Sequence, residues 1–246
     1  MSRVIIALDY PHPTQALELV DRLGDGADFY KVGLELFTRA GAPLVEELRR
    51  RGKRVFLDLK FHDIPATVAG AVRSASRLGA EFLTVHAAGG RAMMEAAVEA
   101  AGSVADAPVA DAADTPAHAP PVRILAVTLL TSLSREEVER TLGRAPVDPT
   151  HEVARLADLA VGAGVHGVVS SPLEVESLRR RLGSDPLLVT PGIRLAGGEA
   201  HDQARIATPE QAIRAGADYL VIGRAVTGAP DPSRALAEIH RTLEAT

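Results

Sequence analysis

The decapeptide RVFLDLKFHD, residues 54–63, joins an apolar strand to a cluster of charges, and a proline follows at position 65. A strand repeats every two residues, so Asp58 and Lys60 point to the same side of it. Opposite charges held this close attract each other, yet both must lose part of their hydration. We therefore interpret the charges as a candidate catalytic array. Pro65 favours a helix that begins just beyond Asp63, which makes this stretch a strand, loop and helix unit.

The same order of strand and helix recurs along the chain. Between the strands lie segments with apolar residues at helical spacing, such as Ala16, Leu17, Val20 and Leu23. Eight repeats of strand and then helix predict an α/β protein with the (β/α)8 or TIM-barrel fold, in which residues 1–246 form one domain. The expected strands cover residues 4–8, 29–32, 55–57, 82–85, 124–127, 167–169, 187–189 and 219–222.

An open, doubly wound sheet is the alternative architecture, because periodicity alone does not show whether a sheet closes. A dinucleotide-binding sheet would carry Gly-x-Gly-x-x-Gly after its first strand, whereas residues 9–13 here read Asp-Tyr-Pro-His-Pro. In a barrel, functional residues belong at the carboxyl ends of the strands. The polar residues expected at those ends are Asp9, Lys31, Asp58, Lys60, His86, Thr131, Ser170, Arg194 and Arg224.

Composition narrows the class of protein further. The 246 residues are 46% hydrophobic, 24% charged and 3% aromatic, include no cysteine, and carry a formal net charge of −5 at pH 7. That charge provides no general field for nucleic acid or anionic membranes, so a phosphate-bearing ligand must be captured locally. The first apolar run, residues 4–8, is too short for a signal or membrane segment. We expect a cytoplasmic protein that binds neither nucleic acid nor a membrane.

Two segments interrupt the repeat. Residues 102–121 are rich in Ala, Pro and Asp without an apolar period, and we expect a flexible surface insertion there. Residues 196–203 are glycine-rich and polar, and they follow the seventh expected strand. A loop at that position is placed to close over a bound ligand.

The charge cluster around Lys60 is the candidate for chemistry. Acidic neighbours favour the protonated form of Lys60, which would make it a proton donor toward a developing carbanion. Asp58 would then lie against an anionic group of the substrate. The alternative is a structural ion-pair network that joins neighbouring strands.

A second group of residues is the candidate for anion binding. Residues 190–194 and 221–224 place a glycine and an arginine after the seventh strand and again after the eighth, where this fold recurrently binds phosphate. Turn-forming glycines with solvent-facing arginines are the alternative interpretation.

The histidines raise the question of a metal. His62 and His86 have no partner at a metal-ligand spacing, and Lys31 and Lys60 would compete as cations for the nearby carboxylates. We therefore expect no metal site, and we interpret His86 as a hydrogen-bonded barrel residue.

The motifs together resemble those of orotidine 5'-phosphate decarboxylases over nearly the whole chain. The most specific is DLKFHDIPAT, residues 58–67, and its companions occur in the expected order. They are residues 6–9 (IALD), 30–33 (YKVG), 127–132 (VTLLTS), 191–194 (PGIR), Gln203 and 222–224 (IGR).

The resemblance implies a homodimeric barrel that converts orotidine 5'-monophosphate to uridine 5'-monophosphate (UMP) and carbon dioxide without a metal or organic cofactor. This is the last step of de novo UMP synthesis. Lys60 matches the proton donor to pyrimidine C6, and Asp58 matches the carboxylate beside the departing group. Lys31 matches the ammonium that links the charges to the ribose, and Asp9 matches a ligand of the nucleoside hydroxyls.

The remaining family positions concern binding. Asp63 and Thr67 match residues that reach across the dimer interface into the neighbouring site. Thr131 corresponds to a residue that touches the pyrimidine. The phosphate-side positions correspond to Arg194, Gln203, Gly223 and Arg224.

This sequence departs from the family pattern at two places that bear no chemistry. Ala66 stands where asparagine is common, and the insertion at 102–121 is longer than usual. Two other functions stay open at this point. One is a magnesium-dependent sugar-phosphate lyase or decarboxylase with the same Asp-x-Lys-x-x-Asp pattern, although such relatives usually place glutamate where Lys31 stands. The other is a catalytically silent barrel that binds a phosphate metabolite.

Overall fold

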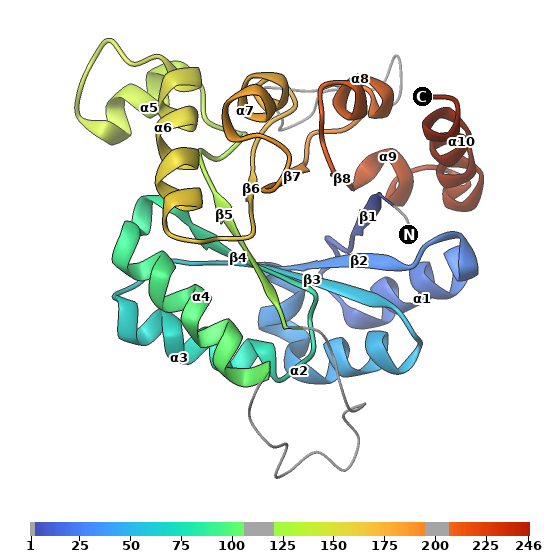
Figure 1. The fold of residues 1–246 in the computed structure, drawn as a ribbon. Helices are drawn as coiled ribbons and strands as arrows, with labels where there is room; N and C mark the ends of the chain where they lie inside the picture. Colours follow the sequence, from blue (N-terminus) through green and yellow to red (C-terminus); the bar gives the residue numbers. More distant parts are fainter. Residues whose placement is uncertain (1–2, 106–120, 195–206) are drawn as a thin grey trace.

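The computed structural model describes residues 3–105, 121–194 and 207–246. Its strands form a closed parallel barrel in sequence order, with β8 paired to β1 (Figure 1). The prediction of a (β/α)8 barrel is therefore confirmed, and the open doubly wound sheet is excluded. The strands are β1 (Val4–Ala7), β2 (Phe29–Gly33), β3 (Arg54–Phe61), β4 (Phe82–His86), β5 (Arg123–Val127), β6 (Gly167–Val169), β7 (Leu187–Thr190) and β8 (Tyr219–Ile222).

Helices surround the barrel (Figure 1). They are α1 (Pro13–Leu23), α2 (Leu34–Arg50), α3 (Pro65–Ser76), α4 (Arg91–Ala105), α5 (Arg135–Leu142), α6 (Pro149–Gly162), α7 (Val175–Leu182), α8 (Pro209–Arg214), α9 (Arg224–Thr227) and α10 (Pro232–Glu244), with short 3-10 turns η1 (Gly24–Gly26) and η2 (Ala87–Gly89). Several begin at signals visible in the sequence. Pro65 occupies the first position of α3, and Ser134 and Glu137 form a reciprocal capping box at the start of α5.

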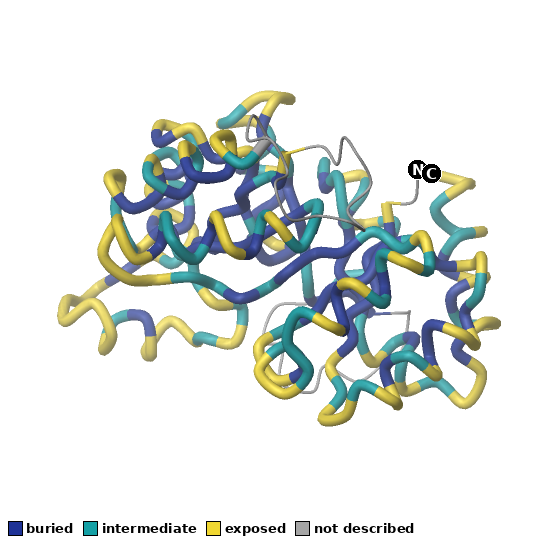
Figure 2. The backbone as a smooth tube through the Cα atoms, turned by 90° about the horizontal axis from the view of Figure 1, so that it is seen from below, coloured by how far each residue is buried: buried dark blue, intermediate teal, exposed yellow. Residues whose placement is uncertain are grey.

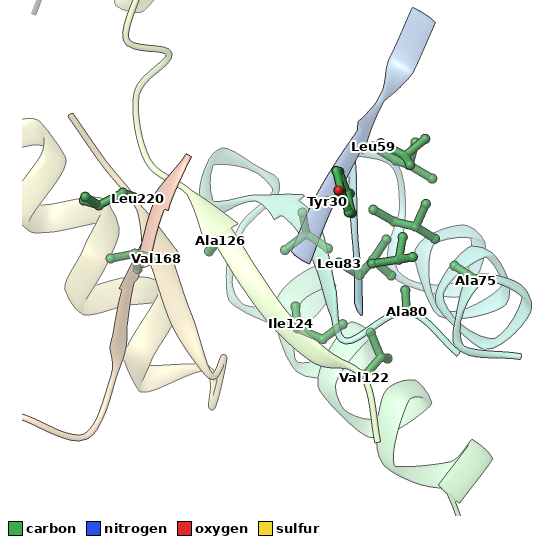
Figure 3. Close-up of a cluster of buried hydrophobic side chains, with 14 of the residues drawn as sticks. Tyr30, Leu59, Ala75, Ala80, Leu83, Val122, Ile124, Ala126, Val168 and Leu220 are labelled. Carbon is green, nitrogen blue, oxygen red and sulfur yellow. The ribbon is translucent and has the colours of Figure 1, made fainter. Parts of the chain in front are cut away.

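The apolar core has two layers, because successive strand residues face opposite sides of the sheet. The outer layer lies between the strands and the helices. In Figure 2 the buried residues of both layers are dark blue. Figure 3 shows Leu83, Ile124 and Ala126 of β4 and β5 in this layer. The inner layer fills the barrel with Ile5, Ala7, Phe29, Phe56, Phe82, Leu125, Val189 and Val221.

The inner layer determines where the charged residues go. Phe29, Phe56 and Phe82 face the barrel interior, so the residues two positions later on each strand face it as well. Those residues are Lys31, Asp58 and Thr84. A polar layer therefore lies directly above the aromatic filling, at the carboxyl ends of the strands.

Two expectations touch segments that the structure describes incompletely. Helix α4 extends to Ala105 and so includes the first residues of the expected insertion at 102–121, while residues 106–120 lie outside the described residues. The expected closing loop at 196–203, including Gln203, also lies outside them. Within the described parts of the chain, none of the helices combines the length and apolar character needed to cross a membrane.

Candidate functional site

The signature segment is a bulged strand. Strand β3 continues through Asp58 and Lys60 to Phe61, where the sequence alone predicts a loop. Its pairing with β4 shifts between Leu57, which aligns with Leu83, and Phe61, which aligns with Val85. Lys60 adopts φ of 50°, and no other non-glycine residue in the described segments has a positive φ. Such a conformation is unfavourable for a residue with a Cβ and is frequent at functional sites, so its position beside the charges makes this segment a candidate site.

Charges of both signs meet beside this bulge. Lys60 Nζ donates to Asp58 Oδ1 at 2.8 Å, and Lys31 Nζ lies 3.6 Å from Asp58 Oδ2. Lys31 Nζ also donates to Asp9 Oδ1 at 3.0 Å. Asp58 thus lies between two ammonium groups, and Lys31 lies between two carboxylates. We call Asp9, Lys31, Asp58 and Lys60 the charge array.

The members of the charge array differ in how far their side chains are buried. The side chains of Lys31 and Asp58 are 11% and 13% exposed, whereas that of Asp9 is 63% exposed. Burial lowers the pKa of Lys31, but Asp58 and Asp9 more than offset it and the pKa lies above its usual value. Burial likewise raises the pKa of Asp58, and Lys31 and Lys60 reverse the shift, so its pKa lies below its usual value. Both residues are therefore charged at neutral pH.

A threonine that sequence reasoning missed completes the arrangement. Thr84 on β4 is fully buried, and its hydroxyl donates to Asp58 Oδ1 at 3.0 Å. The same hydroxyl accepts a hydrogen bond from the Lys60 backbone N–H at 2.9 Å. The available signal was positional, because Thr84 lies two residues after a core phenylalanine on the strand beside β3.

The charge array borders a cavity of about 450 Å³ at the carboxyl ends of the strands. Its lining also includes Gly192 and Arg194, which follow β7, and Gly223 and Arg224, where β8 leads into α9. The Arg194 side chain is mostly buried, and burial together with the nearby Arg224 lowers its pKa. Two guanidinium groups close enough to affect each other favour an anionic ligand. The predicted site residues that line the cavity are Asp9, Lys31, Asp58, Lys60, Thr131, Arg194, Gly223 and Arg224.

Two predicted site residues lie away from this cavity. Asp63 and Thr67 are exposed and are not part of its lining. Asp63 Oδ1 accepts a hydrogen bond from the Ile64 backbone N–H at 2.6 Å, which holds the carboxylate at the turn into α3. Of the three predicted carboxylates, those of Asp9 and Asp58 line the cavity of their own chain and that of Asp63 does not.

The described residues contain no group of three His, Cys, Asp or Glu side chains arranged to hold a metal ion. His62 and His86 lie side by side, with ring centroids 5.5 Å apart. Burial and the nearby His62 and Lys60 lower the pKa of His86. Because its pKa is lowered, His86 is neutral at neutral pH and adds no charge beside the charge array.

Comparison with known proteins identifies relatives of the whole chain. The family model described as "Orotidine 5'-phosphate decarboxylase / HUMPS family" matches residues 2–239. The orotidine 5'-phosphate decarboxylase of Alkalilimnicola ehrlichii is 51% identical over 245 residues, which cover 99% of this chain and 97% of that protein. The protein of that name from Moorella thermoacetica is 48% identical, with 98% and 92% covered. The crystal structure of orotidine 5'-phosphate decarboxylase from Lactobacillus acidophilus superposes with a TM-score of 0.82 and 38% identity, covering 97% of each chain.

Proposed function

The chain belongs to the orotidine 5'-phosphate decarboxylase / HUMPS family, and we propose that it decarboxylates orotidine 5'-monophosphate to UMP without a metal or organic cofactor. The observation that carries this proposal is one cavity lined both by Lys60 and Lys31 around Asp58 and by two arginines, Arg194 and Arg224. A substrate with a reacting carboxylate at one end and a phosphate at the other matches that distribution of charge.

The reaction requires stabilisation of a localised anion. When the bond between C6 and the carboxylate breaks, the electron pair stays on C6 in the plane of the ring, where it cannot delocalise into the carbonyl groups. Lys60 supplies a fixed ammonium toward this carbon and then transfers a proton from Nζ to C6, and solvent afterwards restores that proton. Preorganised charge in a partly buried site lowers such a barrier because little reorganisation is needed.

The neighbours of Lys60 have separate roles in the proposal. Asp58 holds the Lys60 ammonium at 2.8 Å and lies where the substrate carboxylate leaves, so that loss of carbon dioxide relieves repulsion between two anions. Lys31 balances the charge of Asp58 and binds Asp9, whose exposed carboxylate accepts hydrogen bonds from the ribose hydroxyls. Thr131, which lines the same cavity, contacts the pyrimidine in this proposal.

Phosphate binding supplies energy at a distance from the reacting carbon. Arg194 and Arg224 provide charge, and Gly223 lets the backbone approach the phosphate. Gln203, which lies outside the described residues, joins this group in the proposal. Binding energy from the phosphate then aligns C6 with Lys60.

A homodimer is the second part of the proposal. Asp63 and Thr67 are exposed at the start of α3, next to the 66% exposed Ile64. Their exposure outside the cavity of their own chain leaves both side chains accessible to a second copy. We propose that Asp63 and Thr67 enter the cavity of a second copy of this chain and complete its charge array.

The magnesium-dependent sugar-phosphate reaction remains the competing function. A divalent ion would need the carboxylates of Asp9 and Asp58, but the Lys31 ammonium already lies 3.0 Å and 3.6 Å from them. A fixed cation between two carboxylates opposes binding of another cation. The charge array therefore favours decarboxylation of the nucleotide.

Replacement of Lys60 tests the proposal. We expect Lys60→Ala to abolish turnover of orotidine 5'-monophosphate while UMP binding, measured by calorimetry, stays measurable. Lys53→Ala is the matched control, because Lys53 donates to the Gly24 and Ala27 carbonyl oxygens at the opposite end of the barrel and should leave turnover unchanged. Near-normal turnover by Lys60→Ala would reject the proposed role.

A further inference from the structure

Thr84 lies opposite the bulge of β3. The residues of β3 between Leu57 and Phe61 face a shorter segment of β4, between Leu83 and Val85, and Thr84 is the residue in that gap. At this bulge the Lys60 backbone N–H donates to the Thr84 side-chain oxygen instead of to a backbone carbonyl oxygen of β4. Thr84 is fully buried, so no solvent can replace it.

The two hydrogen bonds of Thr84 have a defined direction. A backbone N–H can only donate, so the Thr84 oxygen accepts from Lys60 N and its proton must go to Asp58 Oδ1. Asp58 Oδ1 therefore receives the Thr84 hydroxyl and the Lys60 ammonium at the same oxygen, at 3.0 Å and 2.8 Å. The Thr84 hydroxyl thus links the Lys60 backbone to the same Asp58 carboxylate that the Lys60 ammonium binds.

We propose that Thr84 is a positioning residue that holds the Lys60 backbone in its left-handed conformation and sets the orientation of the Asp58 carboxylate. This inference rests on the proposed function, since it assigns Thr84 a role in placing the proton donor of that reaction. Thr84 does not line the cavity, so it acts through Lys60 and Asp58 and not by contact with the substrate.

The geometry explains why a hydroxyl is needed. Without it, the Lys60 N–H and one lone pair of Asp58 would be buried without a partner, and a positive φ would have no hydrogen bond to hold it. The bulge in β3 would then relax toward regular pairing with β4 and displace the Lys60 ammonium. A displacement of about 1 Å in a catalytic group lowers turnover by about 100-fold.

Isosteric replacement separates positioning from packing. Thr84→Val keeps the volume and removes the hydroxyl, and we expect kcat to fall by about 10- to 100-fold with KM and the Kd for UMP within about threefold of wild type. Thr84→Ser keeps the hydroxyl and should restore most of kcat. Thr128→Val is the matched control, because Thr128 is also buried but donates to the Val169 carbonyl oxygen and should leave kcat unchanged.

Four outcomes would overturn the inference. Three concern kcat: a wild-type value in Thr84→Val, equal losses in Thr84→Val and Thr128→Val, or a failure of Thr84→Ser to recover it. The fourth is a Lys60 backbone amide in the wild-type protein that exchanges its hydrogen with solvent as fast as an exposed amide. The exchange measurement needs no variant and so stays decisive if Thr84→Val does not fold. Absence of turnover in the wild-type protein would instead reject the proposed function itself.

Discussion

The barrel carries a cluster of charged side chains at each end, and the two are built differently. At the carboxyl ends of the strands lies the charge array of Asp9, Lys31, Asp58 and Lys60. At the amino ends lies a second cluster, the floor network, made of Asp28, Arg54, Glu81 and Arg123. Strand β3 contributes to both, because Arg54 and Asp58 face the barrel interior from opposite ends of it.

The floor network pairs its two guanidinium groups with Glu81 and with aromatic rings, while Arg54 Nη1 lies 3.6 Å from Asp28 Oδ2 and is buried without a hydrogen-bond partner. The Arg54 guanidinium donates to Glu81 at 2.6 Å and 2.8 Å and stacks over the Phe29 ring at 4.1 Å. Arg123 also donates to Glu81 and lies 4.5 Å from the Phe82 ring. Burial raises the pKa of Glu81, and Arg54 more than reverses the shift, so the pKa lies below its usual value.

The charge array uses the same kinds of groups in a more open arrangement. Its cations are ammonium groups, it borders a cavity on one side, and its backbone carries a bulge with a positive φ. Guanidinium groups match carboxylates in a planar fork, whereas an ammonium is a point charge that can give up a proton. A closed ion network therefore suits stability and an open one suits chemistry, and four predictions test this difference.

Of these four, Asp58→Asn should change turnover most. Removing this charge takes away the carboxylate that orients Lys60, and we expect kcat to fall by about 10²- to 10³-fold. Asp28→Asn makes the equivalent change in the floor network and should leave kcat unchanged. Steady-state kinetics on both variants provide the measurement, and equal kcat values would remove the distinction between the two ends.

The reverse effect is expected for Glu81→Gln. This change leaves two guanidinium groups without their carboxylate, and we expect the free energy of unfolding to fall by about 2 kcal/mol while kcat stays at the wild-type value. Glu176→Gln is the control, because Glu176 pairs with Arg180 on the surface and should cost less than about 0.5 kcal/mol. Urea unfolding measures both. A loss of kcat without a loss of stability would contradict the assignment.

A smaller effect is expected at the phosphate side of the cavity. Arg224→Ala should raise KM by about tenfold with little change in kcat, because it removes a charge that binds phosphate away from the reacting carbon. Arg91→Ala, which disrupts an exposed pair with Glu95, is the control. An unchanged KM in Arg224→Ala would remove this residue from the binding site.

The smallest effect is a dependence of stability on pH. Burial, His62 and Lys60 place the folded pKa of His86 below 6.5, so the unfolded chain binds more protons between that pKa and pH 6.5. Stability should therefore fall as the pH drops through this window, by at most about 1.4 kcal/mol per pH unit. His86→Gln should flatten the curve of unfolding free energy against pH, and exposed His151→Gln should not. Parallel wild-type and His86→Gln curves would contradict the shift.

Much of the fold can be predicted from the sequence, because the strands of a parallel barrel are buried on both faces and therefore appear as uninterrupted apolar runs. Short apolar runs such as residues 4–8 and 219–222 mark strands covered on both faces, and their alternation with helical patterns predicts the closed barrel. The positions of charged residues after these runs predict that Lys31, Asp58, Lys60 and Arg194 lie at the carboxyl ends of the strands, and in the structure these four residues line the cavity.

The rest of the site depends on three-dimensional features with no local pattern. The bulge in β3 arises from its pairing with β4, so the sequence alone predicts a loop after Leu57. Thr84 looks like an ordinary strand threonine until that pairing places it under Lys60. Asp63 belongs to the same motif as Asp58, but the turn into α3 directs it away from the cavity of its own chain.

Cofactor-free decarboxylation can be tested on the wild-type protein itself. Purified protein treated with EDTA is mixed with orotidine 5'-monophosphate, and the loss of substrate absorbance is followed together with released carbon dioxide. We predict complete conversion to UMP with one carbon dioxide per substrate and no change in rate when magnesium is added. Unchanged absorbance, or turnover that appears only with magnesium, would contradict the account.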